Sequence, residues 1–440
     1  MSISRPPVLE GGLREEAAAR LAEISRALAQ PYDEWTLSRR PDDTGLRSVS
    51  LALGRAGLAV FFAWLWRADL ESEGGAVDHA VRLLEESIEL LPSHSMDASF
   101  LCGFPGVAWT TEHVLGLLAQ TSDDDPNADV DDAILAALAD PTFVPAYDLI
   151  DGLAGHGVYA LERRGRDTAV PMMSAILGRL EATACPQRAG LSWPSGMNTR
   201  TAQGKDVPVD ERFFNLGLSH GVPGVIGILA RFAAVPEVRD RALALLRGVT
   251  TWMREQRLPA ASTGAFGDFV ADGVESEPAR VAWCYGDPGV AASLLAAARA
   301  LDNDDLAAFA LDVAHVAARR DVGSSGVVDA GLCHGSAGVA HIFHRLYRAT
   351  GDATCRDAAR RWFEHLLRRE TDRPNVAGFA TFCFERAPGG EYIEDPAWLT
   401  GAAGVGLVLI SALGASALGD SALSDSLPTW DRPLLLDLDW

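Results

Sequence analysis

Residues 331–338 read Gly-Leu-Cys-His-Gly-Ser-Ala-Gly, and the last four form a Gly-x-x-Gly motif that recurs along the chain. The seven copies begin at Gly54, Gly103, Gly152, Gly221, Gly286, Gly335 and Gly401. Successive copies are 49, 49, 69, 65, 49 and 66 residues apart, which indicates a repeat architecture. A largely apolar stretch follows each copy, so each motif is expected to open a buried helix.

The residues of the motif have separate expected roles at the start of such a helix. The first glycine is expected to make a sharp turn with positive φ. Pro105, Pro223 and Pro288 then stand in the first helical turn, where proline is tolerated. The second glycine is expected to let the helix pack closely against a neighbour.

Amphipathic segments lie between the motifs. Residues 76–91, 169–182, 238–254 and 304–319 combine an apolar side with a charged side, as expected of exposed helices. Each repeat then pairs one buried inner helix with one exposed outer helix. Because the first and last copies resemble the rest, the repeats are expected to close on themselves rather than need caps.

The predicted fold is therefore all-α: an α/α toroid of seven inner and seven outer helices. We expect one domain over residues 1–440, with an N-terminal lead-in at 1–45 and the repeats at 50–420. An open helical solenoid is the alternative. Three longer repeats carry insertions at 191–210, 259–277 and 371–395, where short strands are expected, for instance 379–385 pairing with 391–393.

Composition narrows the class of protein. The chain has 440 residues, of which 48% are hydrophobic, and a net charge of −22. Such an acidic chain is a poor partner for nucleic acid or an anionic membrane. We find neither a signal peptide nor an apolar run of about 18 residues that would span a membrane. Six scattered cysteines are too sparse for a disulfide scaffold and suit a reducing cytoplasm.

Two cysteines and a histidine mark a candidate metal site. Cys284 and Cys333 each stand two residues before the first glycine of their motif, and His334 follows Cys333 directly. Thiolates and an imidazole are zinc ligands, so Zn²⁺ is the expected metal. Three protein ligands leave one position open, which is the pattern of a catalytic rather than a structural zinc.

Other polar residues occupy equivalent positions before the glycine motifs. His220 directly precedes its motif, and Asp148 and Asp151 precede theirs by four and one residues. Equivalent repeats should place these groups at one end of the inner helices, whose positive dipole ends favour anions. His220 suits a general acid or base, and Arg280, four residues before Cys284, could stabilise an oxyanion or enolate.

These strings resemble the lanthionine synthetase C family, the LanC cyclases. The resemblance is carried by residues 147–152 (Tyr-Asp-Leu-Ile-Asp-Gly), 215–221 (Asn-Leu-Gly-Leu-Ser-His-Gly), 283–286 (Trp-Cys-Tyr-Gly) and 333–335 (Cys-His-Gly). The seven glycine motifs also match the family, so the resemblance extends from about Ser50 to the C-terminus. It implies an α/α toroid that binds zinc through Cys284, Cys333 and His334.

The resemblance also implies a reaction. A cysteine of a dehydrated precursor peptide would bind zinc as a thiolate and add to dehydroalanine or dehydrobutyrine, giving a lanthionine or methyllanthionine thioether. His220 would donate the proton to the enolate and Asp148 would orient it or relay the proton. Arg280 and Tyr285 would contact the enolate or the substrate. The chain is expected to be a stand-alone cyclase that needs a separate dehydratase.

Several alternatives stay open at this point. Asp148 could have no role beyond capping a helix, and Tyr285 could have no role beyond lining the cavity. Arg280 could be a surface residue without a functional role. The chain could be a LanC-like protein that binds glutathione or adds it to dehydro-residues. It could also be a prenyltransferase-like zinc toroid, a toroid glycosidase, or a scaffold with structural zinc. The adjacent Cys-His pair argues against the prenyltransferase. A glycosidase needs two acids that face each other across the cavity, and only Asp148 and Asp151 are candidates.

Overall fold

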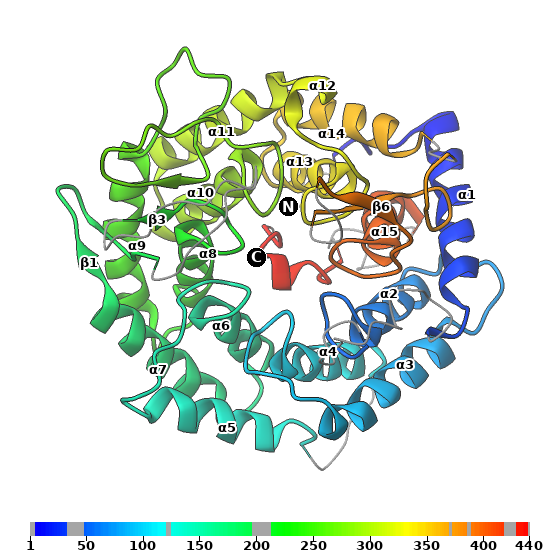
Figure 1. Ribbon diagram of the computed structural model, residues 1–440, viewed down its shortest axis with the longest axis horizontal. Helices are drawn as coiled ribbons and strands as arrows, with labels where there is room; N and C mark the ends of the chain where they lie inside the picture. The colour runs from blue at the N-terminus through cyan, green and yellow to red at the C-terminus, as the bar shows by residue number, and fades with distance from the viewer. Residues whose placement is uncertain are drawn as a thin grey trace. The chain divides into compact units, whose positions relative to one another are not determined.

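The computed structural model describes residues 5–32, 48–119, 125–195, 213–368, 372–384, 389–417 and 428–438 (Figure 1). These residues contain fifteen α-helices and three two-stranded sheets. The chain forms two compact units. The first comprises residues 1–127, 328–431 and 439–440, and the second comprises 128–327 and 432–438. The single domain expected over 1–440 stays a prediction.

All seven glycine motifs open a helix, as predicted. The seven are α2 (Arg55–Arg67), α4 (Phe104–Leu117), α6 (Leu153–Glu162), α8 (Val222–Phe232), α10 (Asp287–Leu301), α13 (Ser336–Thr350) and α15 (Ala402–Ala417). Each begins at the residue that follows the first glycine of its motif. These helices are apolar nearly all round, and every residue of α8 is buried. They therefore form the core, as expected of helices without a polar face.

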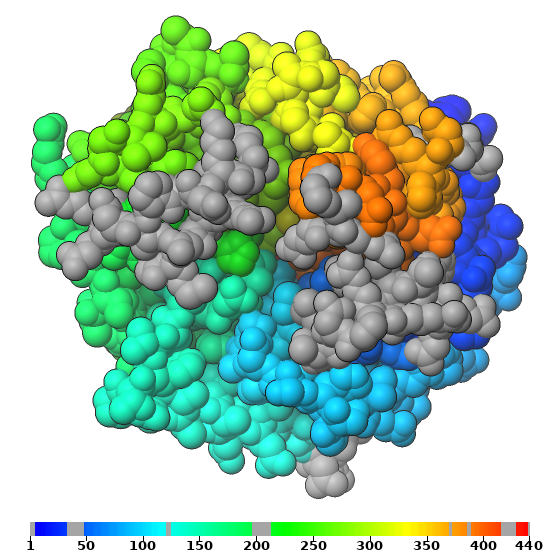
Figure 2. Space-filling view, in the orientation of Figure 1, coloured from blue at the N-terminus to red at the C-terminus, as the bar shows by residue number. Residues whose placement is uncertain are grey.

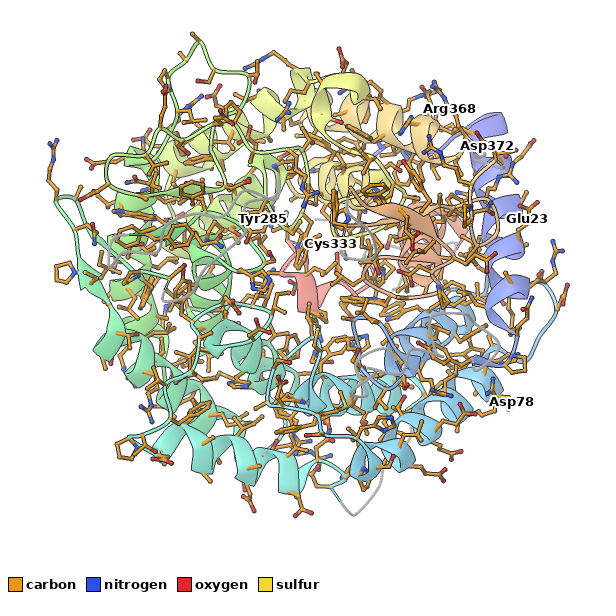
Figure 3. All side chains as sticks on the ribbon, in the orientation of Figure 1. Glu23, Asp78, Tyr285, Cys333, Arg368 and Asp372 are labelled. Carbon is orange, nitrogen blue, oxygen red and sulfur yellow. The ribbon has the colours of Figure 1, made fainter. Side chains whose placement is uncertain are left out.

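Each predicted amphipathic segment forms a helix that packs on the motif helix before it. Helices α3 (Ala76–Leu90), α7 (Ala169–Thr183), α9 (Arg239–Glu255), α11 (Asp304–Arg319) and α14 (Ala353–Leu366) pack on α2, α6, α8, α10 and α13 in that order. Helix α5 (Ala128–Ala139) packs on α7 and lies at the surface in Figure 2. The charged sides of such helices face solvent, as Asp78 does on α3 (Figure 3). The pairing of an inner helix with the outer helix that follows it is thus confirmed for these five motif helices.

The N-terminal segment supplies the helix that packs on α15. Helix α1 (Gly11–Leu28) buries Ala17, Leu21, Ile24 and Leu28, which recur at helical spacing and form one apolar stripe. This stripe contacts α15, which lies almost four hundred residues away in the sequence. The region treated as a lead-in therefore completes the last helix pair.

The glycines of the motif are required by close packing, and the expectation of positive φ is wrong for most of them. Among the first glycines before α2, α4, α6, α8, α10 and α13, only Gly286 has a positive φ, of 145°. A Cβ on Gly152 would lie 2.0 Å from Ala146 O, and one on Gly57 would lie 2.3 Å from Leu51 O. The loop before each helix folds back over its first turn, and a side chain there would collide with the loop backbone.

This packing predicts a large stability difference between two glycines. A Cβ on Gly57 would also meet Trp398 Cβ at 2.5 Å, whereas one on Gly116, near the end of α4, meets nothing within 4 Å. We expect Gly57→Ala to lower the free energy of unfolding by about 1–3 kcal/mol or more, as overpacked cores do. Gly116→Ala is the control and should raise it by up to about 1 kcal/mol. Urea unfolding of both variants checks this, and equal midpoints would contradict the packing explanation.

In the described residues every strand lies in a two-stranded antiparallel sheet, and each sheet has at least one strand in a predicted insertion. The pairs are β1 (Cys185–Pro186) with β2 (Leu191–Ser192), β3 (Phe214–Asn215) with β4 (Phe269–Val270), and β5 (Thr381–Cys383) with β6 (Glu391–Ile393). The predicted pairing of 379–385 with 391–393 is confirmed as β5–β6, while residues 385–388 and 196–210 lie outside the described residues.

Three short helices complete the described structure. They are α12 (Val322–Ser325) and the 3₁₀ helices η3 (Leu91–Ser93) and η4 (Arg432–Leu434). No helix in the described ranges is both long enough and apolar enough to cross a membrane.

Candidate functional site

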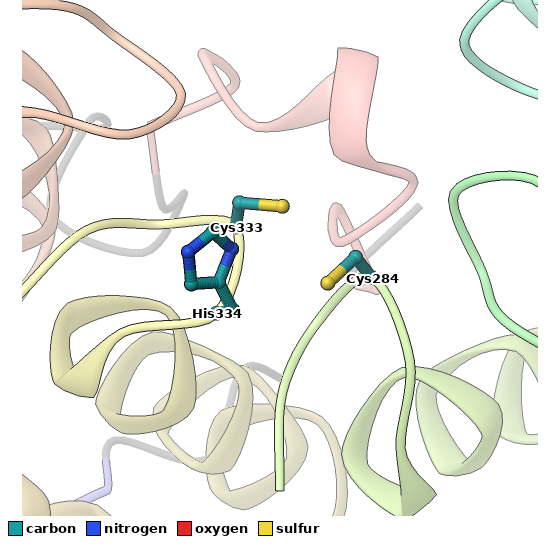
Figure 4. A group of neighbouring side chains, drawn as sticks. All are labelled: Cys284, Cys333 and His334. Atoms are coloured by element: carbon teal, nitrogen blue, oxygen red, sulfur yellow. The ribbon is translucent and has the colours of Figure 1, made fainter. Parts of the chain in front are cut away.

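The predicted metal ligands stand in the loops that lead into two motif helices. Cys284 lies in the loop before α10, and Cys333 and His334 lie in the loop before α13. Their ligand atoms, two Sγ and one imidazole nitrogen, all lie within 4.8 Å of one another (Figure 4). Cys284 is buried, and the other two are half-buried. The structure therefore brings together the three side chains that the sequence proposed as ligands.

This donor set fits a zinc ion. A tetrahedral zinc holds sulfur and nitrogen ligands about 3.5–3.8 Å apart, which small side-chain rotations reach from a spread of 4.8 Å. Two thiolates and an imidazole are soft and borderline donors, which favour zinc over magnesium or calcium. The chemistry of these three residues is thus compatible with zinc.

Backbone hydrogen bonds hold the two loops. The N–H groups of Leu332 and Cys333 both donate to Leu399 O, at 3.1 and 3.0 Å. Cys284 O accepts from Ser219 N at 3.3 Å, and the indole of the adjacent Trp283 donates to Leu434 O at 3.0 Å. Because main-chain groups fix these loops, the ligand side chains start from defined positions.

The first N–H groups of the helices near these loops donate hydrogen bonds to carbonyls of the preceding loop. The first N–H groups of α13, at Ser336, Ala337 and Gly338, donate to the carbonyls of residues 329, 330 and 331 at 2.9, 3.2 and 3.2 Å. The first N–H groups of α6 donate to residues 146–148 in the same way. These donors are usually free to bind an anion. At the starts of α6 and α13 the loop carbonyls occupy these donors, so any preference for anions there would come from the helix dipole and not from free N–H groups.

His220 and Asp148 form a hydrogen-bonded pair in the second unit. His220 Nδ1 lies 2.9 Å from Asp148 Oδ2 and 3.8 Å from Asp151 Oδ2. Burial lowers the pKa of His220, but the hydrogen bond and charge of Asp148, with the charges of Asp151 and Cys284, raise that pKa above its ordinary value. Because Nδ1 faces the carboxylate, Nε2 is the nitrogen whose proton His220 can give to a neighbour.

Asp148 also stabilises the start of a helix, a role that the sequence analysis left open. Its Oδ1 accepts a hydrogen bond from Asp151 N at 2.7 Å, which stabilises the turn before α6. One carboxylate oxygen thus shapes the loop while the other holds His220. The structural and the functional interpretations of Asp148 are compatible, because they use different atoms.

Arg280 lies beside one of the thiols. Its Nη2 is 3.8 Å from Cys284 Sγ, within hydrogen-bonding range for sulfur. A guanidinium at this distance favours the thiolate over the thiol, and the thiolate is the form that binds metal. Arg280 is therefore no isolated surface residue, and its contact in this structure is with a predicted metal ligand.

Tyr285 is packed into the wall behind Cys284. Its hydroxyl oxygen accepts a hydrogen bond from Asn215 Nδ2 at 2.9 Å, and burial raises the pKa of the phenol. A Cβ on Gly217 would lie 2.7 Å from the Tyr285 ring, so the ring packs on bare backbone. The sequence prediction missed Asn215. The available signal was an Asx residue six positions before a motif glycine.

Comparison with known proteins identifies the family of the chain. The profile of the lanthionine synthetase C-like proteins matches residues 46–418. The nisin biosynthesis protein NisC of Lactococcus lactis subsp. lactis is 27% identical over 214 residues, covering 46% of this chain and 50% of NisC. The LanC-like protein GCL1 of Arabidopsis thaliana is 26% identical over 304 residues, covering 64% of this chain and 63% of GCL1.

A third relative is named for a different activity. The glutathione S-transferase LANCL1 of Danio rerio is 29% identical over 137 residues, which is 31% of this chain and 31% of LANCL1. The matches thus span from about a third to two thirds of these relatives.

A solved structure extends the likeness to the whole fold. Nisin cyclase superposes with a TM-score of 0.66 at 18% identity, covering 94% of this chain and 96% of that structure. The predicted all-α class, an α/α toroid, is confirmed by this likeness. Because the family profile covers most of its length, the chain belongs to the lanthionine synthetase C-like family.

Proposed function

We propose that this protein is a zinc-dependent lanthipeptide cyclase, which closes thioether rings in a dehydrated precursor peptide. The observation that carries the proposal is the clustering of Cys284, Cys333 and His334 within 4.8 Å in a chain of this family. The three side chains would hold one Zn²⁺ and leave a position for the substrate. The dehydrated residues would come from a separate dehydratase. The six free cysteines suit a reducing compartment, and we propose the cytoplasm.

Zinc held by these residues would lower the pKa of a peptide cysteine that it binds, so that the cysteine reacts as a thiolate at neutral pH. The substrate sulfur then forms a bond to the β-carbon of dehydroalanine or dehydrobutyrine. The π electrons of the double bond move onto the α-carbon and its carbonyl, giving an enolate. One proton must reach the α-carbon to complete the lanthionine.

His220 would deliver that proton. Its raised pKa favours the imidazolium form, and Nε2 would carry the proton to be transferred. Asp148 would hold the ring through Nδ1 and stabilise its charge. Afterwards His220 regains a proton, for instance from the incoming cysteine thiol of the next ring, so the protons balance over a cycle.

Arg280 and Tyr285 would support the same site. Arg280 would favour the thiolate form of Cys284 and would stabilise the charge of the enolate oxygen, as predicted from its position. Tyr285, fixed by Asn215, would shape the substrate wall beside Cys284. Both roles in the reaction are proposals, and the contacts to Cys284 and Asn215 support them.

A glutathione-adding activity is the second candidate, and the name of the relative LANCL1 favours testing it. One experiment separates the two. A peptide that contains one cysteine and one dehydroalanine is incubated with the protein and glutathione. Ring closure removes the free thiol without changing the peptide mass, because the product is an isomer. Glutathione addition raises the mass by one glutathione and leaves the cysteine free, and that result would replace the cyclase proposal.

The pair of His220 and Asp148 predicts a pH effect. Asp148→Asn removes the charge that raises the pKa of His220, so that pKa falls. His220 acts as an acid only below its pKa, so the alkaline limb of the kcat/KM profile should move to lower pH. Asp151→Asn is the matched control, since that carboxylate is 3.8 Å away and more exposed, and should move the limb less. Identical profiles for the wild type and Asp148→Asn would contradict the assignment.

A further inference from the structure

Four of the loops that lead into motif helices share one Asx residue. Asp97, Asn215, Asp329 and Asp395 each stand six positions before the first glycine of a motif. In each, Oδ1 accepts a hydrogen bond from the backbone N–H two residues later, at 2.9, 2.8, 3.3 and 2.9 Å in that order. This Asx turn helps the loop fold back onto the helix start. The turn alone accounts for an Asx residue at this position.

The turn uses one side-chain atom of each residue, and in three of them the second atom has a partner of its own. At Asp395, Oδ2 accepts from the hydroxyl of Thr400 at 2.6 Å. At Asp329, Oδ2 accepts from Phe382 N at 3.1 Å and lies 3.3 Å from His334 Nε2. The Asp329 side chain is only 1% exposed, so this oxygen faces protein groups rather than water. Asp329 therefore contacts a residue of the candidate zinc site through an atom that the turn does not need.

We propose that Asp329 is a positioning residue for the zinc site: it holds Nε2 of His334 and so presents Nδ1 to the metal. A carboxylate accepts the N–H of an imidazole, which fixes the tautomer and leaves the other ring nitrogen with its lone pair free for a metal. The proposal rests on the proposed function, since it needs zinc at Cys284, Cys333 and His334.

The same oxygen joins the zinc ligand to the β5–β6 hairpin. Phe382, whose N–H it accepts, belongs to β5, and the ring of Phe384 just beyond β5 lies 5.8 Å from the His334 ring between centroids. The hairpin is further held by the edge-to-face contact of Phe382 with Tyr392 of β6, at 5.0 Å. Asp329, whose Oδ2 lies 3.3 Å from Nε2, and the hairpin would thus restrict His334 through its nitrogen and its ring, and a ligand held in this way would lose little freedom on binding metal.

Zinc affinity tests the proposal without using activity. Zinc is titrated into metal-free wild type, Asp329→Asn and Asp329→Ser in competition with a chromophoric chelator. Asp329→Asn keeps the Asx turn but turns the second oxygen into a donor, and Asp329→Ser keeps one acceptor for the turn and removes the second oxygen. Both should bind zinc about 10–100-fold more weakly than the wild type. In the cobalt-substituted protein, both should also shift the visible ligand-field bands.

Asp395→Asn is the matched control, because it alters a buried Asx turn of the same kind that touches none of the proposed ligands, and its zinc affinity should equal that of the wild type. Wild-type affinity and cobalt spectra in both Asp329 variants would overturn the role of Asp329 while leaving the zinc site intact. A loss of affinity as large in Asp395→Asn would also overturn it, since the effect would then come from removing a buried carboxylate at this loop position and not from the contact with His334. Wild-type protein that binds no zinc would instead overturn the proposed function itself, which makes the two failures distinguishable.

Discussion

Cys333→Ala is expected to lose most of the bound zinc and to reduce ring closure to the background of uncatalysed thiol addition. Cys284, Cys333 and His334 are the three proposed ligands, and removal of one thiolate leaves two protein donors for a metal that needs at least three. Metal analysis of the purified protein should find about one equivalent of zinc per chain in the wild type and much less in the variant.

The fold should survive this loss. The core consists of the motif helices and their partners, whose apolar side chains are buried against one another and need no metal, as the fully buried α8 illustrates. Helical circular dichroism of Cys333→Ala should therefore match the wild type, unlike that of a zinc finger without its metal. Cys102→Ala is the control, since this half-buried cysteine belongs to no candidate metal group among the described residues. Full zinc retention in both Cys284→Ala and Cys333→Ala would remove the proposed site.

His220→Ala is expected to keep its zinc and to slow ring closure by about 10²–10⁴-fold, the usual contribution of a general acid. His220 is the one histidine held by Asp148, its pKa is raised, and its side chain is 38% exposed, so substrate can reach it. The measurement follows free thiols in a dehydrated peptide over time, and the stereochemistry of the rings is a second readout.

Two results would change the role of His220. Unaltered rate and unaltered stereochemistry in His220→Ala would take it out of the mechanism. Loss of zinc in that variant would make it a metal ligand instead of a proton donor. His156→Ala offers a control, since that histidine is buried in α6 and is not among the groups that shift the pKa of His220.

The starts of the motif helices could be predicted from the sequence, because close packing requires glycine at these positions and the motif occurs seven times. A Cβ on Gly152 or Gly57 would strike backbone, and no flexible side chain can yield there, so the motif marks each helix start. The expected reason, positive φ, was wrong at most copies because the constraint comes from the loop folded over the helix. The repeat in the sequence shows that glycine is needed at these positions. It does not show which contact in the folded protein excludes a side chain there.

The partner of α15 could not be found from the repeat. Its outer helix is α1, at the other end of the chain, and the apolar stripe of Ala17, Leu21, Ile24 and Leu28 contains no sign of what it will cover. The same limit applies to the site. Cys284, Cys333 and His334 are visible because zinc requires those residue types, whereas Asp329 resembles any other Asx turn until the position of its second oxygen is known.

X-ray absorption at the zinc edge tests the central claim most directly, because it counts the sulfur atoms around the metal. The account predicts two sulfur neighbours at about 2.3 Å, with nitrogen or oxygen neighbours at about 2.0–2.1 Å. When a dehydrated peptide with one cysteine is added, the count should rise to three, and it should stay at two when that cysteine is replaced by serine. A shell of four protein ligands that does not change when the cysteine peptide is added would contradict the account, since the zinc would then be structural.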